Sequence, residues 1–235
     1  MRRAAGVGEA DGQIMMRRHD TGIGTYDGLR HISQAVNLTV RKIDKITIAA
    51  MQGYAIQTGF SLALACDYRI ADTTAKMGSA TLRFGLLPDE GGQYLLVQHL
   101  GLQRALDVSA ATLPTQPTCL APLTSQAAQF LMRKKIVDAA EADELGLLHK
   151  VVEPEQLLPE ALALARELAE GPQVAMRLLK KTVYNAAELS FEKACDDIAT
   201  ATAITDHHPD THGAIAAFRE GKPAVFNEWL NNPKL

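Results

Sequence analysis

One short stretch of the chain places polar residues at the beginning of an otherwise apolar helix. From Gly53 to Asp72 the sequence reads GYAIQTGFSLALACDYRIAD, and its second half predicts a buried helix followed by a strand. The first turn of a helix leaves backbone N–H groups without an intrahelical acceptor, and these groups can hold an anion or a developing oxyanion. A plain cap, in which the side chain of Gln57 or Thr58 satisfies those groups, explains the same residues. This stretch alone leaves both interpretations open.

A second candidate is the segment DHHPDTH near the C-terminus, which contains His207, His208 and His212. His208 and His212 are four residues apart, a spacing that suits two metal ligands on one face of a helix. Pro209 lies between them and indicates a turn or a helix start, and no fourth ligand is evident from the sequence. We therefore predict a solvated turn here and no metal site.

The bulk composition limits what the chain can do. It has 235 residues, of which 47% are hydrophobic and 22% charged, with a net charge of −3, so it is expected to fold as a globular protein. There is no excess of basic residues, which argues against nucleic acid as a partner, and no apolar run approaches the ~18 residues of a membrane span. The three cysteines, Cys66, Cys119 and Cys195, are far apart, which favours a reducing compartment.

The order of the predicted elements indicates an α/β protein. A helix is expected over residues 26–41, then a short strand in ITIAAMQG, the helix GFSLALACD, the strand YRIAD, and a further helix from GGQYLLVQHL. This alternation predicts a core of stacked parallel strands. From Pro154 onward the pattern is helical throughout. We therefore expect a core over residues 1–153 and a helical region over 154–235.

Residues 108–129 do not fit this pattern. The segment VSAATLPTQPTCLAPLTSQAAQ has three prolines and no charged residue, and it interrupts two segments that otherwise join smoothly. One interpretation is a long surface loop, although loops of this length are uncommon in a compact domain. The other is a retained intron, since the segment could begin with a splice-donor-like sequence and is in frame, which would imply a eukaryotic gene.

Several motifs together resemble the enoyl-CoA hydratase/isomerase family, also called the crotonase superfamily. The helix-start pattern G-x-A-x-G-G-G-x-E-L-A-L-A-C-D is similar to residues 53–67, and G-L-x-P-[GD]-x-G-G is similar to residues 85–92. Two later segments, AAEADELGLLHKVVEPEQL and AIAAFREGKPAVF, also resemble the family. The resemblance covers roughly residues 44–226 apart from the unusual segment. It implies a core of stacked ββα units that is shortened at its N-terminus, followed by the C-terminal helical region.

The resemblance gives the helix start a function. Family members bind acyl-CoA thioesters and place the thioester oxygen between two backbone N–H groups, which stabilise an enolate. One of these oxyanion-hole donors corresponds to Thr58, where the family has glycine. The other corresponds to Ala10, in the segment GVGEADGQIM. Gly59 is expected to contact the substrate beside them.

The acid/base residues depart from the family pattern. Hydratases of the family use two glutamates, whose positions are occupied here by Ser61 and Thr81, so these residues are expected to contact the substrate without acting as general bases. Asp89 stands where family isomerases keep a catalytic carboxylate, and Glu90 is its neighbour and the second candidate. The alternative role for Asp89 is a cap on the following helix.

The C-terminal region implies binding and assembly. Lys222 matches a basic position that in the family meets the CoA phosphates, and the resemblance implies a homotrimer or a hexamer formed by two trimers. No cofactor is expected, because coenzyme A is part of the substrate. The final residues, Pro233-Lys234-Leu235, are similar to a peroxisomal import signal, and without such import the protein would be cytoplasmic. A peroxisomal acyl-CoA enzyme of a eukaryote also resembles, faintly, fungal members of toxin or polyketide-type pathways.

These features together predict enolate chemistry on an acyl-CoA thioester. Double-bond isomerisation, with Asp89 as the base, is favoured over water addition because both hydratase glutamates are replaced. The alternative is a catalytically inactive homologue with a binding or assembly role, which the replacements at Ser61 and Thr81 would also explain.

Overall fold

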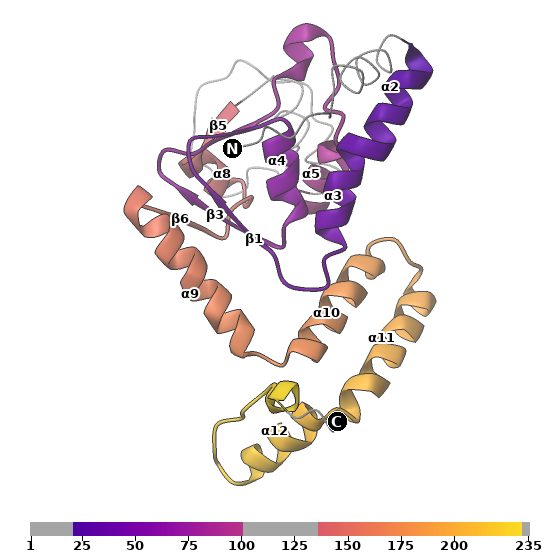
Figure 1. Ribbon diagram of the computed structural model, residues 1–235, viewed down its shortest axis with the longest axis vertical. Helices are drawn as coiled ribbons and strands as arrows, with labels where there is room; N and C mark the ends of the chain where they lie inside the picture. The colour runs from indigo at the N-terminus through magenta and orange to yellow at the C-terminus, as the bar shows by residue number, and fades with distance from the viewer. Residues whose placement is uncertain (1–20, 101–135, 232–235) are drawn as a thin grey trace, which may run out of the picture. The chain divides into compact units, whose positions relative to one another are not determined.

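The computed structural model describes residues 21–100 and 136–231, which form two compact units (Figure 1). The first unit contains residues 49–100 and 136–157 together with the helical segment before Ile43. Its elements are α2 (Gly22–Gly28), the π-helix η1 (Leu29–Ser33), α3 (Gln34–Arg41), β1 (Ile48–Met51), β2 (Tyr54–Ile56), α4 (Thr58–Ala65), β3 (Tyr68–Asp72), β4 (Lys76–Gly78), the 3-10 helix η2 (Thr81–Phe84), α5 (Gly92–Leu100), β5 (Ile136–Asp138), α8 (Ala139–Glu144), β6 (Lys150–Val152) and the 3-10 helix η3 (Pro154–Gln156).

Two small sheets organise the first unit. One has the strand order β1-β3-β6, with β3 and β6 parallel, and the other has the order β2-β4-β5. In the second sheet β2 and β4 are parallel, whereas β4 and β5 are antiparallel. The predicted α/β core of parallel strands is present in the β2–β4 and β3–β6 pairs, and β5 differs because it pairs antiparallel with β4. Strand β5 leads directly into α8.

Helix α4 lies at the centre of the core and contacts α3, α5 and β2. From Phe60 to Ala65 all but one of its residues are buried, as expected for a helix that is apolar on every side. Strands β3 and β4 contribute further buried residues, among them Ala71 and Met77. The predicted helix GFSLALACD and strand YRIAD are confirmed, and the helix expected over 26–41 is present as α2, η1 and α3 in succession.

The second unit is helical. It comprises residues 43–48 and 158–231, and its elements are α9 (Leu157–Glu170), α10 (Gln173–Ala186), α11 (Phe191–Asp206), α12 (Pro209–Arg219) and the 3-10 helix η4 (Glu228–Asn231). Helix α11 packs against both α10 and α12. The Ser190 side chain caps α11 and the His208 side chain caps α12. The helical C-terminal region expected from the sequence is confirmed.

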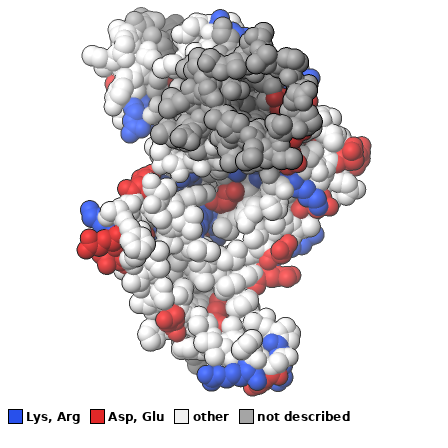
Figure 2. Space-filling model, turned by 180° about the vertical axis from the view of Figure 1, so that it is seen from behind, with Lys and Arg blue, Asp and Glu red and all other residues white. Residues whose placement is uncertain are grey.

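The numbers of acidic and basic residues in the sequence are nearly balanced, and the surface shows the same mixture of charges. On the face shown in Figure 2, acidic and basic side chains of the described residues are interspersed. Among the described residues, no helix is both long and apolar enough to cross a membrane. The unusual segment 108–129, Cys119, Ala10 and the terminal Pro233-Lys234-Leu235 lie outside the described residues.

Candidate functional site

The beginning of α4 is built differently from a plain capped helix. Gln57 is the N-cap residue, but its side chain makes no capping hydrogen bond. The hydroxyl of Thr58 instead donates to the carboxylate of Glu90, with 2.6 Å between Thr58 Oγ1 and Glu90 Oε1. The interpretation of these two residues as simple side-chain caps is therefore wrong. The Thr58 hydroxyl and the Gln57 amide face a carboxylate 32 and 33 residues further along the chain. The first backbone N–H groups of a helix have no intrahelical acceptor.

Glu90 is a buried carboxylate, with 7% of its surface exposed. Besides the hydroxyl of Thr58, the amide of Gln57 faces it, with 3.5 Å between Gln57 Nε2 and Glu90 Oε2. Burial raises the pKa of the Glu90 carboxyl above its usual value; the hydrogen bond from Thr58 opposes this shift, and the adjacent Asp89 carboxylate adds to it. A carboxyl group with a raised pKa can take up and return protons more readily near neutral pH than an ordinary glutamate.

Helix α3 fixes the main chain of this acidic pair. Gln34 Nε2 donates to the carbonyl oxygen of Asp89 at 2.9 Å, and Asn37 Nδ2 donates to the carbonyl oxygen of Glu90 at 2.7 Å. Gln34 and Asn37 are three residues apart, so both lie on the same face of α3. These two hydrogen bonds restrain the consecutive carbonyl groups of Asp89 and Glu90. The main-chain conformation is fixed there, and with it the direction in which each acidic side chain points. Glu90 is buried as a result, whereas Asp89 is only partly buried.

Ser61 and Thr81 are the two positions at which, by family resemblance, hydratases are expected to have glutamates. Ser61 is buried in the second turn of α4, where a Cβ added at Gly92 would come within 2.5 Å of the serine Oγ. Thr81 begins η2, and its Oγ1 lies 3.0 Å from Ser79 Oγ. Ser79 Oγ in turn donates to Gln57 Oε1 at 2.6 Å. Thr81 is therefore linked to Glu90 through Ser79 and Gln57.

The other predicted residues are placed as follows. Gly59 is exposed, and a Cβ added there would meet no described atom within 4 Å, so this side of the helix start is open within the described part of the chain. Lys222 is in the second unit, where its Nζ forms an exposed ion pair with Glu220 at 2.7 Å.

His208 Nδ1 accepts a hydrogen bond from the backbone of Asp210, and its ring meets Trp229 edge to face. Ala10 lies outside the described residues.

The sequence did not single out Gln34, Asn37 or Ser79. The signal for Asn37 was present: an amide within a helix whose apolar residues recur at helical spacing is a candidate for a buried hydrogen bond. The role of Ser79 depends on a contact between residues 22 positions apart, which no local pattern reveals.

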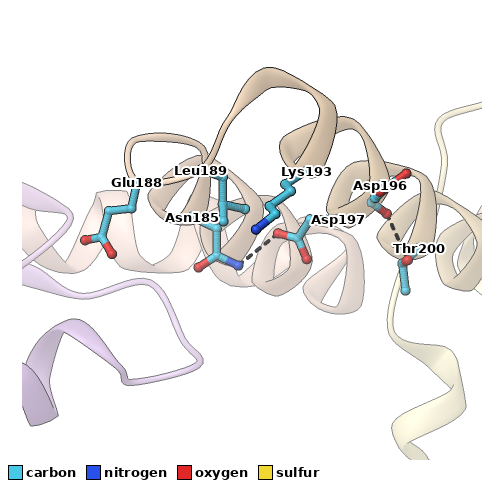
Figure 3. Close-up of a pocket in the computed structure, with 7 residues that line it drawn as sticks. All are labelled: Asn185, Glu188, Leu189, Lys193, Asp196, Asp197 and Thr200. Atoms are coloured by element: carbon cyan, nitrogen blue, oxygen red, sulfur yellow. Dashed lines mark hydrogen bonds between the residues drawn. The ribbon is translucent and has the colours of Figure 1, made fainter.

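A separate hollow of about 450 Å³ lies between α10 and α11 (Figure 3). Its lining residues are Asn185, Glu188, Leu189, Lys193, Asp196, Asp197 and Thr200. The amide of Asn185 donates to the Asp197 carboxylate at 2.8 Å, and the Thr200 hydroxyl donates to the Asp196 carbonyl at 2.9 Å. Polar groups in this hollow thus bond to one another, and none of the residues predicted to do chemistry lines it.

The arrangement around Glu90 places a buried carboxyl group at the beginning of a helix whose first N–H groups can stabilise negative charge. The sequence was compared with models of known protein families. The model of the family described as enoyl-CoA hydratase/isomerase matches residues 10–118 and 124–229. The chain belongs to the enoyl-CoA hydratase/isomerase family. The match is interrupted only at residues 119–123, which lie inside the unusual segment.

Individual members of the enoyl-CoA hydratase/isomerase family agree with this assignment. A crotonyl-CoA hydratase of Syntrophomonas wolfei is 30% identical over 195 residues, which cover 83% of this chain and 66% of that protein. The crystal structure of subunit I of a Geobacillus kaustophilus enoyl-CoA hydratase matches with a TM-score of 0.69 and 28% identity, over 83% of this chain and 67% of that one. An enoyl-CoA hydratase/isomerase of Cupriavidus metallidurans, at 24% identity, matches in fold with a TM-score of 0.76 over 92% of this chain and 74% of its own.

The expected crotonase-type α/β fold is therefore confirmed. The chain spans just under two thirds of the length of the first curated relatives it matches, for example 66% of the Syntrophomonas wolfei protein and 61% of a Mycobacterium leprae protein. Both relatives are named as hydratases.

Proposed function

We propose that this protein is an acyl-CoA enzyme that moves a double bond along the acyl chain, with the carboxyl group of Glu90 carrying the proton. The observation that supports this most strongly is the hydrogen bond between Thr58 and the buried Glu90 at the beginning of α4. It brings an acid/base group next to the backbone N–H groups that, by family resemblance, hold the thioester oxygen. Among Asp89 and Glu90, the two carboxylates expected from the sequence, the structure favours Glu90.

The proposed reaction converts a 3-enoyl-CoA into a 2-enoyl-CoA. The carboxylate of Glu90 removes a proton from C2, and the electrons of that C–H bond form an enolate, whose oxygen is stabilised by the N–H of Thr58. Electrons then return from the oxygen through C2 and C3, the double bond moves to C2=C3, and C4 takes the proton back from Glu90. Atoms and charges balance without a cofactor. Asp89 supports the step because its charge helps to keep the pKa of Glu90 raised.

Water addition is less well supported by the residues present. The family's hydratases activate water with two carboxylates, and the corresponding positions hold the hydroxyl groups of Ser61 and Thr81. A hydroxyl group does not accept a proton from water near neutral pH. We therefore expect hydration to be much slower than isomerisation.

The second candidate is an inactive homologue that binds acyl-CoA. The observation in its favour is that Thr58 carries a side chain at a position where the family has glycine, and this side chain is bonded to Glu90. If it obstructs the thioester, the protein would bind the substrate weakly or unproductively.

The experiment that distinguishes these candidates measures binding and turnover on the same protein. Calorimetry gives the affinity for a saturated acyl-CoA, and the rise in ultraviolet absorbance on conjugation gives the isomerisation of a 3-enoyl-CoA. The isomerase proposal predicts both binding and turnover, with hydration of a 2-enoyl-CoA slower by about tenfold or more, since it lacks a general base. Binding without either reaction would identify the inactive homologue.

We also propose a homotrimer or hexamer, assembled through the helical region of residues 154–235, with Lys222 contacting the CoA phosphates. Family resemblance supports both statements. The terminal Pro-Lys-Leu supports location in the peroxisome, and a pathway of secondary metabolism would fit that location.

A further inference from the structure

Gln57 has a backbone conformation that side chains rarely adopt. Its φ is 55° and its ψ is −113°. For residues other than glycine, positive φ is unfavourable because Cβ approaches the backbone, and this region is populated almost entirely by glycine. Such strain is maintained only when the surrounding structure holds it, and it often marks a functional site.

The main-chain hydrogen bonds of Gln57 do not require its side chain. Its N–H donates to the Gly78 carbonyl at 2.9 Å, and its carbonyl accepts the first helical hydrogen bond of α4 from the Ser61 N–H, also at 2.9 Å. Glycine at this position would make both bonds without strain. The side chain makes no cap, so local backbone structure does not explain why a glutamine stands here.

The side chain of Gln57 does form part of a hydrogen-bond chain that ends at Glu90. Ser79 Oγ uses its single proton to donate to Gln57 Oε1 at 2.6 Å. The 3.0 Å contact between Thr81 Oγ1 and Ser79 Oγ must therefore have Thr81 as its donor. Because Gln57 Oε1 accepts from Ser79, its Nε2 is the group that faces Glu90 Oε2, at 3.5 Å. The donors thus run in one direction, from Thr81 through Ser79 and Gln57 to Glu90.

We propose that Gln57 is a positioning residue that holds the Glu90 carboxylate for proton transfer, and that this role explains its strained backbone. Thr58 donates to Oε1 of Glu90 and Gln57 faces Oε2, so the two neighbours restrain both oxygens of one carboxylate. The primary amide of Gln57 gives up no proton near neutral pH, so the chain orients Glu90 and does not relay protons. This inference rests on the proposed function.

The test compares Gln57→Gly with Gln57→Ala in the full-length protein. Glycine removes both the strain and the amide, whereas alanine removes the amide and keeps the strain. We expect the melting temperature of Gln57→Gly to exceed that of the parent and of Gln57→Ala. Both variants should lose kcat for a 3-enoyl-CoA by about tenfold, the scale expected when a reacting group is less well positioned, with KM nearly unchanged.

A gain in stability together with a loss of kcat would support the proposal, because a merely structural residue would lower both when it is removed. A Gln57→Gly variant with the kcat of the parent would overturn the proposal, and so would one that loses stability and kcat together. A parent without any turnover overturns the proposed function as well. An active parent with unaffected Gln57 variants overturns this inference alone.

Ser79→Ala tests the same chain one step earlier. It removes the donor that fixes the orientation of the Gln57 amide while leaving Gln57 and its backbone strain in place. We expect kcat to fall, less than in Gln57→Ala, and Ser79→Thr to restore it, because threonine supplies the same hydroxyl group. Unchanged kcat in Ser79→Ala would show that the amide needs no such support and would contradict the proposed chain.

Discussion

At the scale of single residues, the contact between Thr58 and Glu90 determines how the site can work. The carboxyl group of Glu90 is subject to two opposing influences: burial raises its pKa, and the Thr58 hydroxyl, which donates to the ionised form, lowers it. The balance leaves the pKa raised above its usual value. A group in this state can serve as a base in one half of the proposed isomerisation and as an acid in the other.

Replacing Thr58 by valine should move the pH dependence of the reaction. Valine has a similar shape and no donor, so the carboxylate of Glu90 loses a hydrogen bond that favours its charged form, and its pKa rises further. Because the base must be ionised to remove a proton from C2, the acidic limb of the kcat/KM profile should shift to higher pH. Thr58→Ser, which keeps the hydroxyl group, is the control and should retain the parent's profile. An acidic limb that stays in place in Thr58→Val would show that Glu90 is not the titrating base.

The sequence identified the acidic pair and, by family resemblance, ranked Asp89 above Glu90, but it could not show which of the two is buried. Asp89 and Glu90 are neighbours, so which of them is buried depends on the direction of the main chain after Pro88. That direction is fixed by the amides of Gln34 and Asn37, which are more than fifty residues away. The expectation that Asp89 is the base rested on family resemblance, and it remains a prediction that the final experiment below compares with Glu90.

At the scale of elements, a buried arginine connects the parts that surround α4. Arg69, on β3, has 9% of its surface exposed. Its Nε donates to the Leu147 carbonyl at 2.6 Å, and its Nη1 donates to the Cys66 carbonyl, at the C-terminal end of α4, at 2.8 Å. Its Nη2 lies 3.5 Å from Nδ1 of His99 on α5. Burial, together with the charge of Arg69, lowers the pKa of His99 to about 4, so His99 is neutral near pH 7.

Arg69→Leu should destabilise the first unit by about 2–5 kcal/mol, because two buried carbonyl groups lose their donors. Leucine fills part of the volume, so the loss reflects hydrogen bonding more than packing. Chemical denaturation would measure it, with Arg41→Leu, a replacement of a partly exposed arginine on α3, as the comparison. If Arg69→Leu lowers the free energy of unfolding no more than Arg41→Leu does, the structural role of Arg69 is contradicted.

The elements themselves were largely predictable. The apolar run in α4 and the β-branched or apolar residues in β1 and β3 carry strong local signals, and all three were expected at nearly the observed bounds. The antiparallel direction of β5 was not predictable, because it depends on a pairing with β4 some sixty residues earlier in the chain. The hydrogen-bond chain from Thr81 to Glu90 was likewise beyond local patterns.

At the scale of the whole molecule, membership of the enoyl-CoA hydratase/isomerase family is established, and the activity remains our proposal. The chain covers 66% of the Syntrophomonas wolfei crotonyl-CoA hydratase, and the family resemblance places Ser61 and Thr81 where hydratases are expected to have glutamates. The proposed oxyanion donor at Thr58 lies at the beginning of α4, and Ala10, the expected second donor, lies outside the described residues. The interpretations of residues 108–129 as a loop or a retained intron also remain predictions.

In the proposed isomerisation of an acyl-CoA, the carboxyl group of Glu90 carries the proton. The most direct test of this role is the kcat of Glu90→Gln and Asp89→Asn for a 3-enoyl-CoA at saturating substrate, with acyl-CoA affinity measured on the same samples. Both substitutions remove a carboxylate and keep the size of the side chain, and glutamine can still accept the hydrogen bond from Thr58. We predict that Glu90→Gln lowers kcat by about 10²-fold or more, the usual scale for a general base, with affinity nearly unchanged, and that Asp89→Asn costs less. A Glu90→Gln variant that turns over as fast as the parent would contradict the account, and a large loss in Asp89→Asn alone would assign the role to Asp89.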